Sequence, residues 1–245
     1  MLVRRQSFKN SGNESCFLWG ARQTGKSTLL KFLYPESLYF DLLLSDEYER
    51  LVRRPSLLRE VIEGSNLSSP VIVDEIQRIP ELLNEVHWLI ENRGIRFILS
   101  GSSPRKILRS GGNLLGGRAL RYELHPLVSA EIPGFDLVKA LNNGLLPRHY
   151  LSNNPGKLLS AYLGSYLRDE IITEARIRNI TSFSRFLEAA AFSNGEMVNY
   201  TNIAADCGVS SPTVREYFQI LADTMTGHFL PSFQKNPKRS VINAP

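Results

Sequence analysis

Cysteine and long apolar runs are scarce in this sequence, and both absences narrow the class of protein. Only two of the 245 residues are cysteines, Cys16 and Cys207, and they fit neither a disulfide framework nor a zinc site. No stretch approaches the roughly 20 apolar residues of a membrane span, and no apolar segment follows the basic N-terminus as in a signal peptide. We therefore expect a protein of the reducing cytoplasm that has no membrane span.

Neither sign of charge dominates the chain. Its 29 Lys and Arg residues against 24 Asp and Glu leave a formal net charge of +5, which permits nucleic-acid binding without requiring it. Hydrophobic residues make up 42% of the chain, enough to bury a core, and we find no internal repeat or low-complexity tract. The composition is that of a globular protein with one large domain or two smaller ones.

The first half alternates short apolar runs with longer helix-like segments. This alternation predicts an α/β fold, with a five-stranded, mainly parallel sheet and helices on both faces. The expected strands are 15–20, 38–42, 70–75, 96–101 and 120–124. The expected helices are 26–34, 54–63 and 82–92, with Gly94 as the C-cap of the last.

A stretch with two prolines and a glycine, residues 125–134, ends this alternation. We therefore expect a first domain over residues 1–130. Residues 157–192 show apolar positions at helical spacing, which predicts helices. The expected second and third parts are a helical lid or linker over 131–181 and a winged helix-turn-helix over 182–245.

The stretch "GARQTGKS" matches the phosphate-binding pattern G-x-x-x-x-G-K-[ST], and it follows a predicted strand and opens a predicted helix. In such a loop, backbone N–H groups face the phosphates, Lys26 adds positive charge, and the Ser27 hydroxyl ligates magnesium. The expected nucleotide-binding residues are Gly20, Ala21, Arg22, Gln23, Thr24, Gly25, Lys26, Ser27 and Thr28. A glycine-bearing turn between a strand and a helix is the alternative interpretation.

The run "VIVDEIQRIP" places two carboxylates at the C-terminal end of an apolar strand, the edge where open α/β sheets gather ligands. Asp74 is expected to hold magnesium together with Ser27, and Glu75 to polarise the attacking water. The alternative is an exposed strand end that carries two solvated charges.

Two further residues complete the expected catalytic set with Lys26 and Glu75. Ser100, at the end of the strand in "FILSGSSP", is expected to bind the γ-phosphate or the lytic water, whereas Ser102 and Ser103 either join it or cap a following helix. Arg118, in the loop before the fifth strand, is expected to reach a γ-phosphate from its own or a neighbouring subunit. A surface arginine at a strand start is the alternative.

Together these segments resemble a group of AAA-type P-loop ATPases of bacteria and archaea. The resemblance rests on "GARQTGKSTLL", "VIVDEIQRIPELL", "FILSGSSPRKIL", "LLGGRALRYELHPLVSAE" and "NYTNIAADCGVSSPTVREYFQIL". It implies ATP and Mg²⁺ binding by the core, a winged-helix segment and a C-terminal nuclease-like domain. The chain stops at "NPKRSVINAP", about where that last domain would begin, so we expect it to be missing here.

The segment "NYTNIAADCGVSSPTVREYFQIL" fits a helix-turn-helix, with Gly208 in the turn and Ser210 capping the second helix. The basic stretch "HFLPSFQKNPKRS" would form a wing. The expected DNA-contacting residues are Thr213, Arg215, Gln219, Lys238 and Arg239. A packing or partner-binding module is the alternative.

The leading functional prediction is Mg²⁺-dependent ATP binding and hydrolysis coupled to a conformational change of the helical lid and the winged helix. The alternative is a nucleotide-gated DNA-binding or protein-interaction module whose hydrolysis is slow or incidental. ATP is the expected small-molecule partner, with duplex DNA, a second copy of the chain or another protein as further candidates.

Overall fold

A computed structural model of the chain describes residues 4–5, 12, 14–67, 69–109, 115–164 and 179–231. The chain divides into two compact units, Met1–Leu158 and Leu159–Pro245. Over the part of the chain so described, no helix is both long and apolar enough to cross a membrane.

The first unit is built on a sheet of five strands in the order β2-β3-β4-β1-β5. All four neighbouring pairs are parallel. The strands are β1 (Ser15–Trp19), β2 (Tyr39–Asp41), β3 (Val71–Asp74), β4 (Phe97–Gly101) and β5 (Ala119–Glu123). Every residue of β1, β3 and β4 is buried, as expected for strands covered on both faces. The predicted α/β fold with a five-stranded parallel sheet is thus present, and no strand end differs from the expected one by more than one residue.

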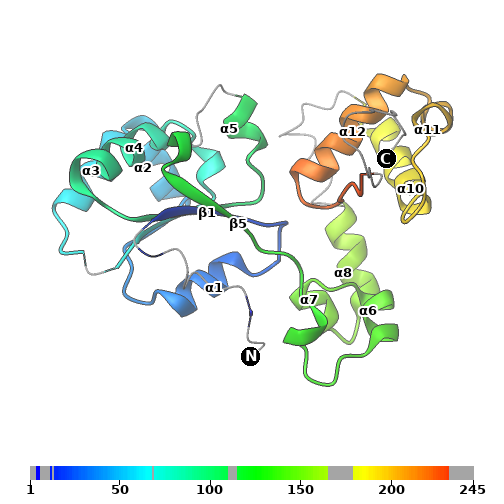
Figure 1. The fold of residues 1–245 in the computed structure, drawn as a ribbon, viewed down its shortest axis with the longest axis horizontal. Coiled ribbons are helices and arrows are strands. Elements are labelled where there is room, and N and C mark those ends of the chain that lie inside the picture. The colour runs from blue at the N-terminus through cyan, green and yellow to red at the C-terminus, as the bar shows by residue number, and fades with distance from the viewer. Residues whose placement is uncertain are drawn as a thin grey trace, which may run out of the picture. The chain divides into compact units, whose positions relative to one another are not determined.

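Helices cover both faces of the sheet (Figure 1): α1 lies on one face and α2, α3 and α4 lie on the other. Their bounds are α1 (Lys26–Leu33), α2 (Ser45–Arg53), α3 (Ser56–Glu63) and α4 (Leu82–Arg93). Gly94 ends α4 with φ 63°, which confirms its predicted role as a C-cap.

Helix α2 was not among the predicted helices. Most of its residues are polar or charged and only Leu51 is buried, so it contributes little to the core. Charged residues stabilise α2 through the helix dipole: its first turn carries Asp46 and Glu47, and its last turn carries Arg50 and Arg53.

A short helix, α5 (Arg105–Arg109), follows β4, and the chain after β5 continues through α6 (Leu137–Asn143) and α7 (Pro147–Tyr150). This last segment has a small core of its own. Its buried members are Leu127, Ile132, Ala140 and Tyr150. The first compact unit thus extends to Leu158. The three-part division at residues 130 and 181 stays a prediction about domain organisation.

The second unit contains α10 (Ile180–Phe192), α11 (Tyr200–Cys207) and α12 (Ser211–Asp223), after α8 (Pro155–Ala161), which spans the division. Aromatic rings hold the three helices together: the ring centroids of Phe186 and Phe218 are 4.8 Å apart, and those of Phe183 and Tyr217 are 5.0 Å apart. Residues 165–178 of the predicted helical region and the predicted wing beyond residue 231 lie outside the described residues.

Candidate functional site

The predicted phosphate-binding residues form the loop between β1 and α1. Gly25, the residue before α1, has φ 92°, a left-handed conformation that glycine adopts without strain. No side chain caps the N-terminus of α1. An anion could therefore accept hydrogen bonds from the first backbone N–H groups of this helix. Thr24 is fully buried and its hydroxyl donates to the Ala21 carbonyl at 2.8 Å, which holds the loop curled.

Lys26 lies back on the same loop. Its side chain is 5% exposed, and Nζ donates to the carbonyl oxygens of Gly20 at 2.7 Å and Ala21 at 3.4 Å. These are weak neutral acceptors for a cation, and an anionic phosphate oxygen in the loop would compete with them strongly. The Lys26 ammonium group thus lies close to the expected position of the phosphate.

Asp74 is the centre of a hydrogen-bond cluster at the C-terminal ends of three strands. It is 1% exposed, and its Oδ2 accepts from the Ser27 and Tyr39 hydroxyls, each at 2.6 Å. Its Oδ1 accepts from the Ser100 hydroxyl and from the Glu75 N–H at 3.1 Å. Strand register explains the meeting, because Asp74 pairs with Ser100 across β3 and β4. Three predicted residues, Ser27, Asp74 and Ser100, are therefore brought together.

Tyr39 is a member of this cluster that the sequence analysis did not identify. Burial, and then the neighbouring Asp74 charge, raise the pKa of its phenol well above the ordinary value. The hydroxyl therefore stays protonated and donates to Asp74 at all physiological pH values. Its position at the start of β2 gave no signal, since aromatic residues are common in strands.

Glu75 follows Asp74 and turns out of the strand. Its backbone has φ 61°, a left-handed conformation that is uncommon for a residue with a side chain. Burial raises the pKa of its carboxyl group, and the Lys26 charge opposes that rise. A carboxylate whose pKa is raised accepts a proton more readily than one at the ordinary value, which is compatible with the predicted role of Glu75.

The two serines after Ser100 have different roles. The Ser103 hydroxyl accepts from the Arg105 N–H at 3.1 Å, so Ser103 caps the start of α5, which is one of its two predicted roles. The Ser102 hydroxyl instead accepts from the side-chain amide of Gln77 at 2.9 Å.

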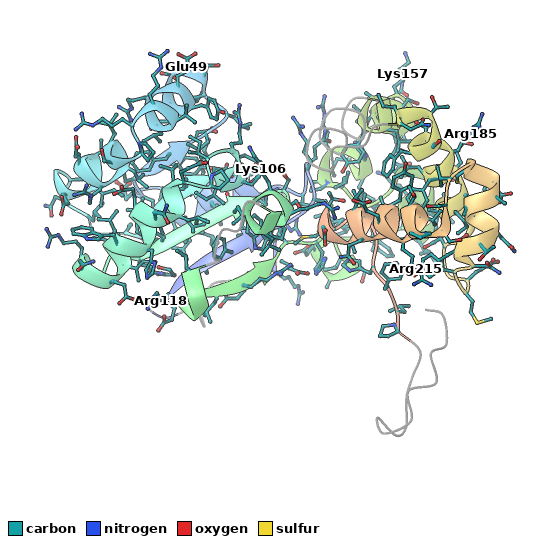
Figure 2. The ribbon with its side chains drawn as sticks, turned by 90° about the horizontal axis from the view of Figure 1, so that it is seen from above. Glu49, Lys106, Arg118, Lys157, Arg185 and Arg215 are labelled. Carbon is teal, nitrogen blue, oxygen red and sulfur yellow. The ribbon has the colours of Figure 1, made fainter. Side chains whose placement is uncertain are left out.

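Arg118 lies at the opposite edge of the sheet, which corrects the expectation that it joins Asp74 and Glu75. Ala119, the next residue, pairs with Ser15 at the start of β1, whereas the phosphate loop follows the end of β1. Four strand residues separate the two edges by about 13 Å. The Arg118 guanidinium pairs instead with Glu91 of α4, and both side chains are partly exposed (Figure 2). Arg118 thus does not lie with the phosphate loop in this structure, and its contact with a γ-phosphate stays a prediction.

An N-terminal arginine supports the phosphate loop from outside. The Arg4 guanidinium donates to the carbonyl oxygens of Thr24 at 2.6 Å and His125 at 2.5 Å, and pairs with Glu131 at 3.2 Å. Glu131, which is 3% exposed at its side chain, also accepts from the backbone N–H groups of Arg5 and Val128. Although burial alone would raise it, these hydrogen bonds and the Arg4 charge bring the pKa of Glu131 below its ordinary value.

The second unit shows the predicted turn geometry. Gly208 ends α11 with φ 66°, and the Ser210 side chain caps α12 by accepting from the Thr213 N–H. The three described candidates for DNA contact have local partners. The Thr213 hydroxyl lies 2.9 Å from that of Ser210, Arg215 lies over the Tyr200 ring at 4.9 Å, and Gln219 donates to Asp223 at 2.7 Å (Figure 2). Lys238 and Arg239 lie outside the described residues.

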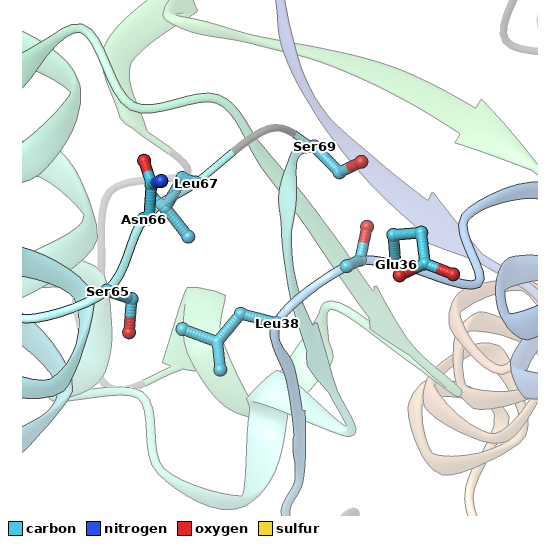
Figure 3. A pocket seen from close by; sticks show the side chains of 7 residues that line it. Glu36, Leu38, Ser65, Asn66, Leu67 and Ser69 are labelled. Atoms are coloured by element: carbon cyan, nitrogen blue, oxygen red, sulfur yellow. The ribbon is translucent and has the colours of Figure 1, made fainter.

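A polar hollow of about 280 Å³ lies elsewhere on the first unit (Figure 3). It is lined by Glu36, Ser37, Leu38, Ser65, Asn66, Leu67 and Ser69. These residues precede β2 and β3, so the hollow lies at the edge opposite the phosphate loop. It is not part of the Asp74 cluster.

Two family models match the chain. Residues 12–132 match an AAA domain, and residues 134–245 match a domain of unknown function (DUF8612). The residues that match the AAA domain lie within the first unit. The boundary between the matches falls just after Glu131, the residue that ties the N-terminus to the phosphate loop.

The chain is also similar to two mycobacterial proteins, uncharacterized protein Rv2008c of Mycobacterium tuberculosis and uncharacterized protein Mb2031c of Mycobacterium bovis. Each is 26% identical over 217 residues, which cover 85% of this chain and 47% of the relative. The chain thus spans about half the length of the curated relatives it matches.

Among solved structures, two variants of Thermotoga maritima RuvB align with 85% of this chain and 79% of theirs, at 16% identity. Their TM-scores are 0.39 and 0.38.

Proposed function

We propose that the first unit binds ATP with Mg²⁺ and hydrolyses it. The observation that carries this proposal is the convergence of Ser27, Asp74 and Ser100 at the open N-terminus of α1. The AAA domain match over residues 12–132 supports it, since that match includes all three residues. A solvated strand end would not bury the Asp74 carboxylate under three hydroxyl donors.

The loop from Gly20 to Thr28 binds the phosphates through its backbone N–H groups and the dipole of α1. Lys26 exchanges the carbonyls of Gly20 and Ala21 for phosphate oxygens, where its charge is better compensated. Glu75 accepts a proton from the attacking water, and Ser100 donates to an oxygen near the reacting centre.

The Ser27 hydroxyl and the Asp74 carboxylate fit Mg²⁺, because both are oxygen donors and already lie 2.6 Å apart. When bound there, the ion would neutralise charge on the β- and γ-phosphate oxygens. The remaining steps belong to the side chains of the chain itself.

We further propose that hydrolysis is coupled to movement of the helices after residue 131 and of the α11–α12 pair. Arg118, if catalytic, acts from a neighbouring subunit, which requires a second copy of the chain. Both cysteines are free and buried, in keeping with a cytoplasmic location.

Phosphate release tests the activity directly. We expect Mg²⁺-dependent turnover by the wild type, loss of nucleotide binding in Lys26→Ala, and binding without turnover in Glu75→Gln. Asn92→Leu, an exposed amide on α4, is a control that should behave as the wild type. A wild type that releases no phosphate with Mg²⁺ and any accessory chain would contradict the proposal.

A nucleotide-gated DNA-binding or interaction module is the second candidate. It is favoured by one specific observation, the α11–α12 turn with Gly208 in the left-handed region and Ser210 as the cap. Titration of duplex DNA at two salt concentrations tests it, because phosphate contacts weaken as salt rises. Binding that is absent, or insensitive to salt, would count against DNA as the partner.

A further inference from the structure

Gln77 lies beneath the site and contacts the proposed general base. It belongs to the short η2 turn (Ile76–Arg78) that follows β3, and it is 4% exposed. Its side-chain nitrogen donates to the Glu75 carboxylate and to the Ser102 hydroxyl at 2.9 Å. One amide group therefore joins the residue after β3 to the residue after β4.

The Gln77 amide is packed closely against Gly101. A Cβ on Gly101 would lie 2.2 Å from Gln77 Oε1 and 2.6 Å from the Trp19 ring, so a larger residue there would displace one of them. The Gly101 carbonyl in turn accepts from the Gly20 N–H at 3.3 Å. The Gln77 amide is thus packed against the same backbone that supports the start of the phosphate loop.

Two unfavourable features converge on this contact. Gln77 Oε1 is buried and accepts no hydrogen bond from the residues that the structure describes. The Glu75 backbone is left-handed, which is strained for a residue with a Cβ. Such features persist where the surrounding structure holds them in place, and they cluster at functional sites.

We propose that Gln77 is a positioning residue for Glu75: its amide N–H groups hold the carboxylate at the phosphate loop and tie it to Ser102 at the end of β4. This inference rests on the proposed hydrolysis, in which Glu75 accepts the proton. It assigns a role to the glutamine of the "DEIQ" run, which no step of the mechanism above uses.

A positioning role for Gln77 predicts a particular kinetic signature. Its amide donates to the Glu75 carboxylate and to the Ser102 hydroxyl, so loss of the amide should misplace Glu75 and lower kcat while leaving the KM for ATP unchanged. A purely structural role would not separate kcat from KM in this way.

The test compares Gln77→Met, which keeps the length of the side chain without an N–H group, with the wild type, Glu75→Gln and the control Asn92→Leu. We expect kcat for ATP hydrolysis to fall about 10- to 100-fold in Gln77→Met, as for small misplacements of a catalytic group. The KM for ATP should stay unchanged. Gln77→Glu should lower kcat at least as much, because its carboxylate donates no N–H to Glu75 and carries a like charge.

The possible results distinguish the role of Gln77 from the proposed ATP hydrolysis. The role of Gln77 is overturned, and the proposed hydrolysis is left intact, if the wild type turns over ATP, Glu75→Gln does not, and Gln77→Met has an unchanged kcat. A wild type without turnover overturns both. If Gln77→Met is poorly folded by circular dichroism, Ser102→Ala decides, because the Gln77 amide then loses its second acceptor. An unchanged kcat in that variant overturns the positioning role.

Discussion

The two compact units differ in what they bury. The first unit buries charged and polar groups at one edge of its sheet, among them Lys26, Asp74, Gln77 and Ser100. In the described part of the second unit the buried polar residues are Ser182 and Thr224, and its interior is built of aromatic rings. Buried polar groups are costly unless they are satisfied, so their concentration in the first unit indicates a site rather than a core.

The largest effect is expected from Asp74→Asn, which removes the charge at the centre of the cluster. We expect ATP turnover to fall by on the order of 100-fold, the loss typical of removing one key electrostatic contact. The pKa of Tyr39, which burial and then the Asp74 charge raise, should also fall and can be followed by ultraviolet titration of the phenol. Asp46→Asn, in the first turn of α2, is the control, and equal losses in both variants would contradict the assignment.

The corresponding change in the second unit should affect stability. Phe186 is fully buried among Phe183, Tyr217 and Phe218, so Phe186→Ala should destabilise that unit by about 3–5 kcal/mol. Phe192, on the same helix, is 87% exposed, so Phe192→Ala should have little effect. Denaturant unfolding measures both, and similar losses for the two variants would show that α10 does not pack as described.

A smaller effect is expected where the first unit ties its N-terminus to the phosphate loop. Glu131→Gln weakens the contacts to Arg4 and Arg5 and should lower the free energy of unfolding by about 1–3 kcal/mol at neutral pH. Because the folded-state pKa of Glu131 is lowered, its contribution is present above the ordinary value of 4.5 and is lost as the pH falls through the folded pKa. The variant should therefore lose less stability in acid than the wild type does.

Glu49→Gln is the matched control for that experiment, because Glu49 is 65% exposed in its pair with Arg53 on α2 (Figure 2). We expect its unfolding to follow the wild type at every pH. An acid dependence that is the same in Glu131→Gln and in the wild type would show that the buried pair does not titrate with folding.

The smallest effect is expected from Arg118→Ala. Its partner Glu91 is partly exposed, and the pair lies at the edge away from the phosphate loop. In dilute solution, where the chain is monomeric by light scattering, turnover should equal that of the wild type. A deficit that grows with protein concentration would support action from a second copy, whereas a deficit in the monomer would contradict the placement of Arg118.

Local pattern was sufficient for the sheet and for much of the site. The β1, β3 and β4 segments are continuous apolar runs, and parallel strands bring their C-terminal ends to one edge, so Ser27, Asp74 and Ser100 could be placed together. The same rule would have placed Arg118 at the other edge, because a residue before a parallel strand lies at the opposite edge of the sheet from a residue after one.

Contacts that depend on tertiary structure were not predictable. Arg4 and Glu131 are 127 residues apart in the sequence, and no local sequence pattern predicts that they pair. Gln77 was visible in the "DEIQ" run, but its contact with Ser102 depends on how η2 packs against the end of β4. Helix α2 was not predicted, because most of its residues are polar or charged and only Leu51 is buried.

The strand order has a consequence for synthesis of the chain. The first strand made, β1, lies between β4 and β5, which are made last. At about 5–20 residues per second, the ribosome takes on the order of ten seconds to add the segment from Trp19 to Glu123. During that interval the apolar stretch "SCFLW" has neither neighbour, and the nascent chain exposes an unpaired strand that is prone to aggregate. Expression of the first unit should therefore depend on chaperones more than expression of the helical second unit, whose contacts are local in sequence.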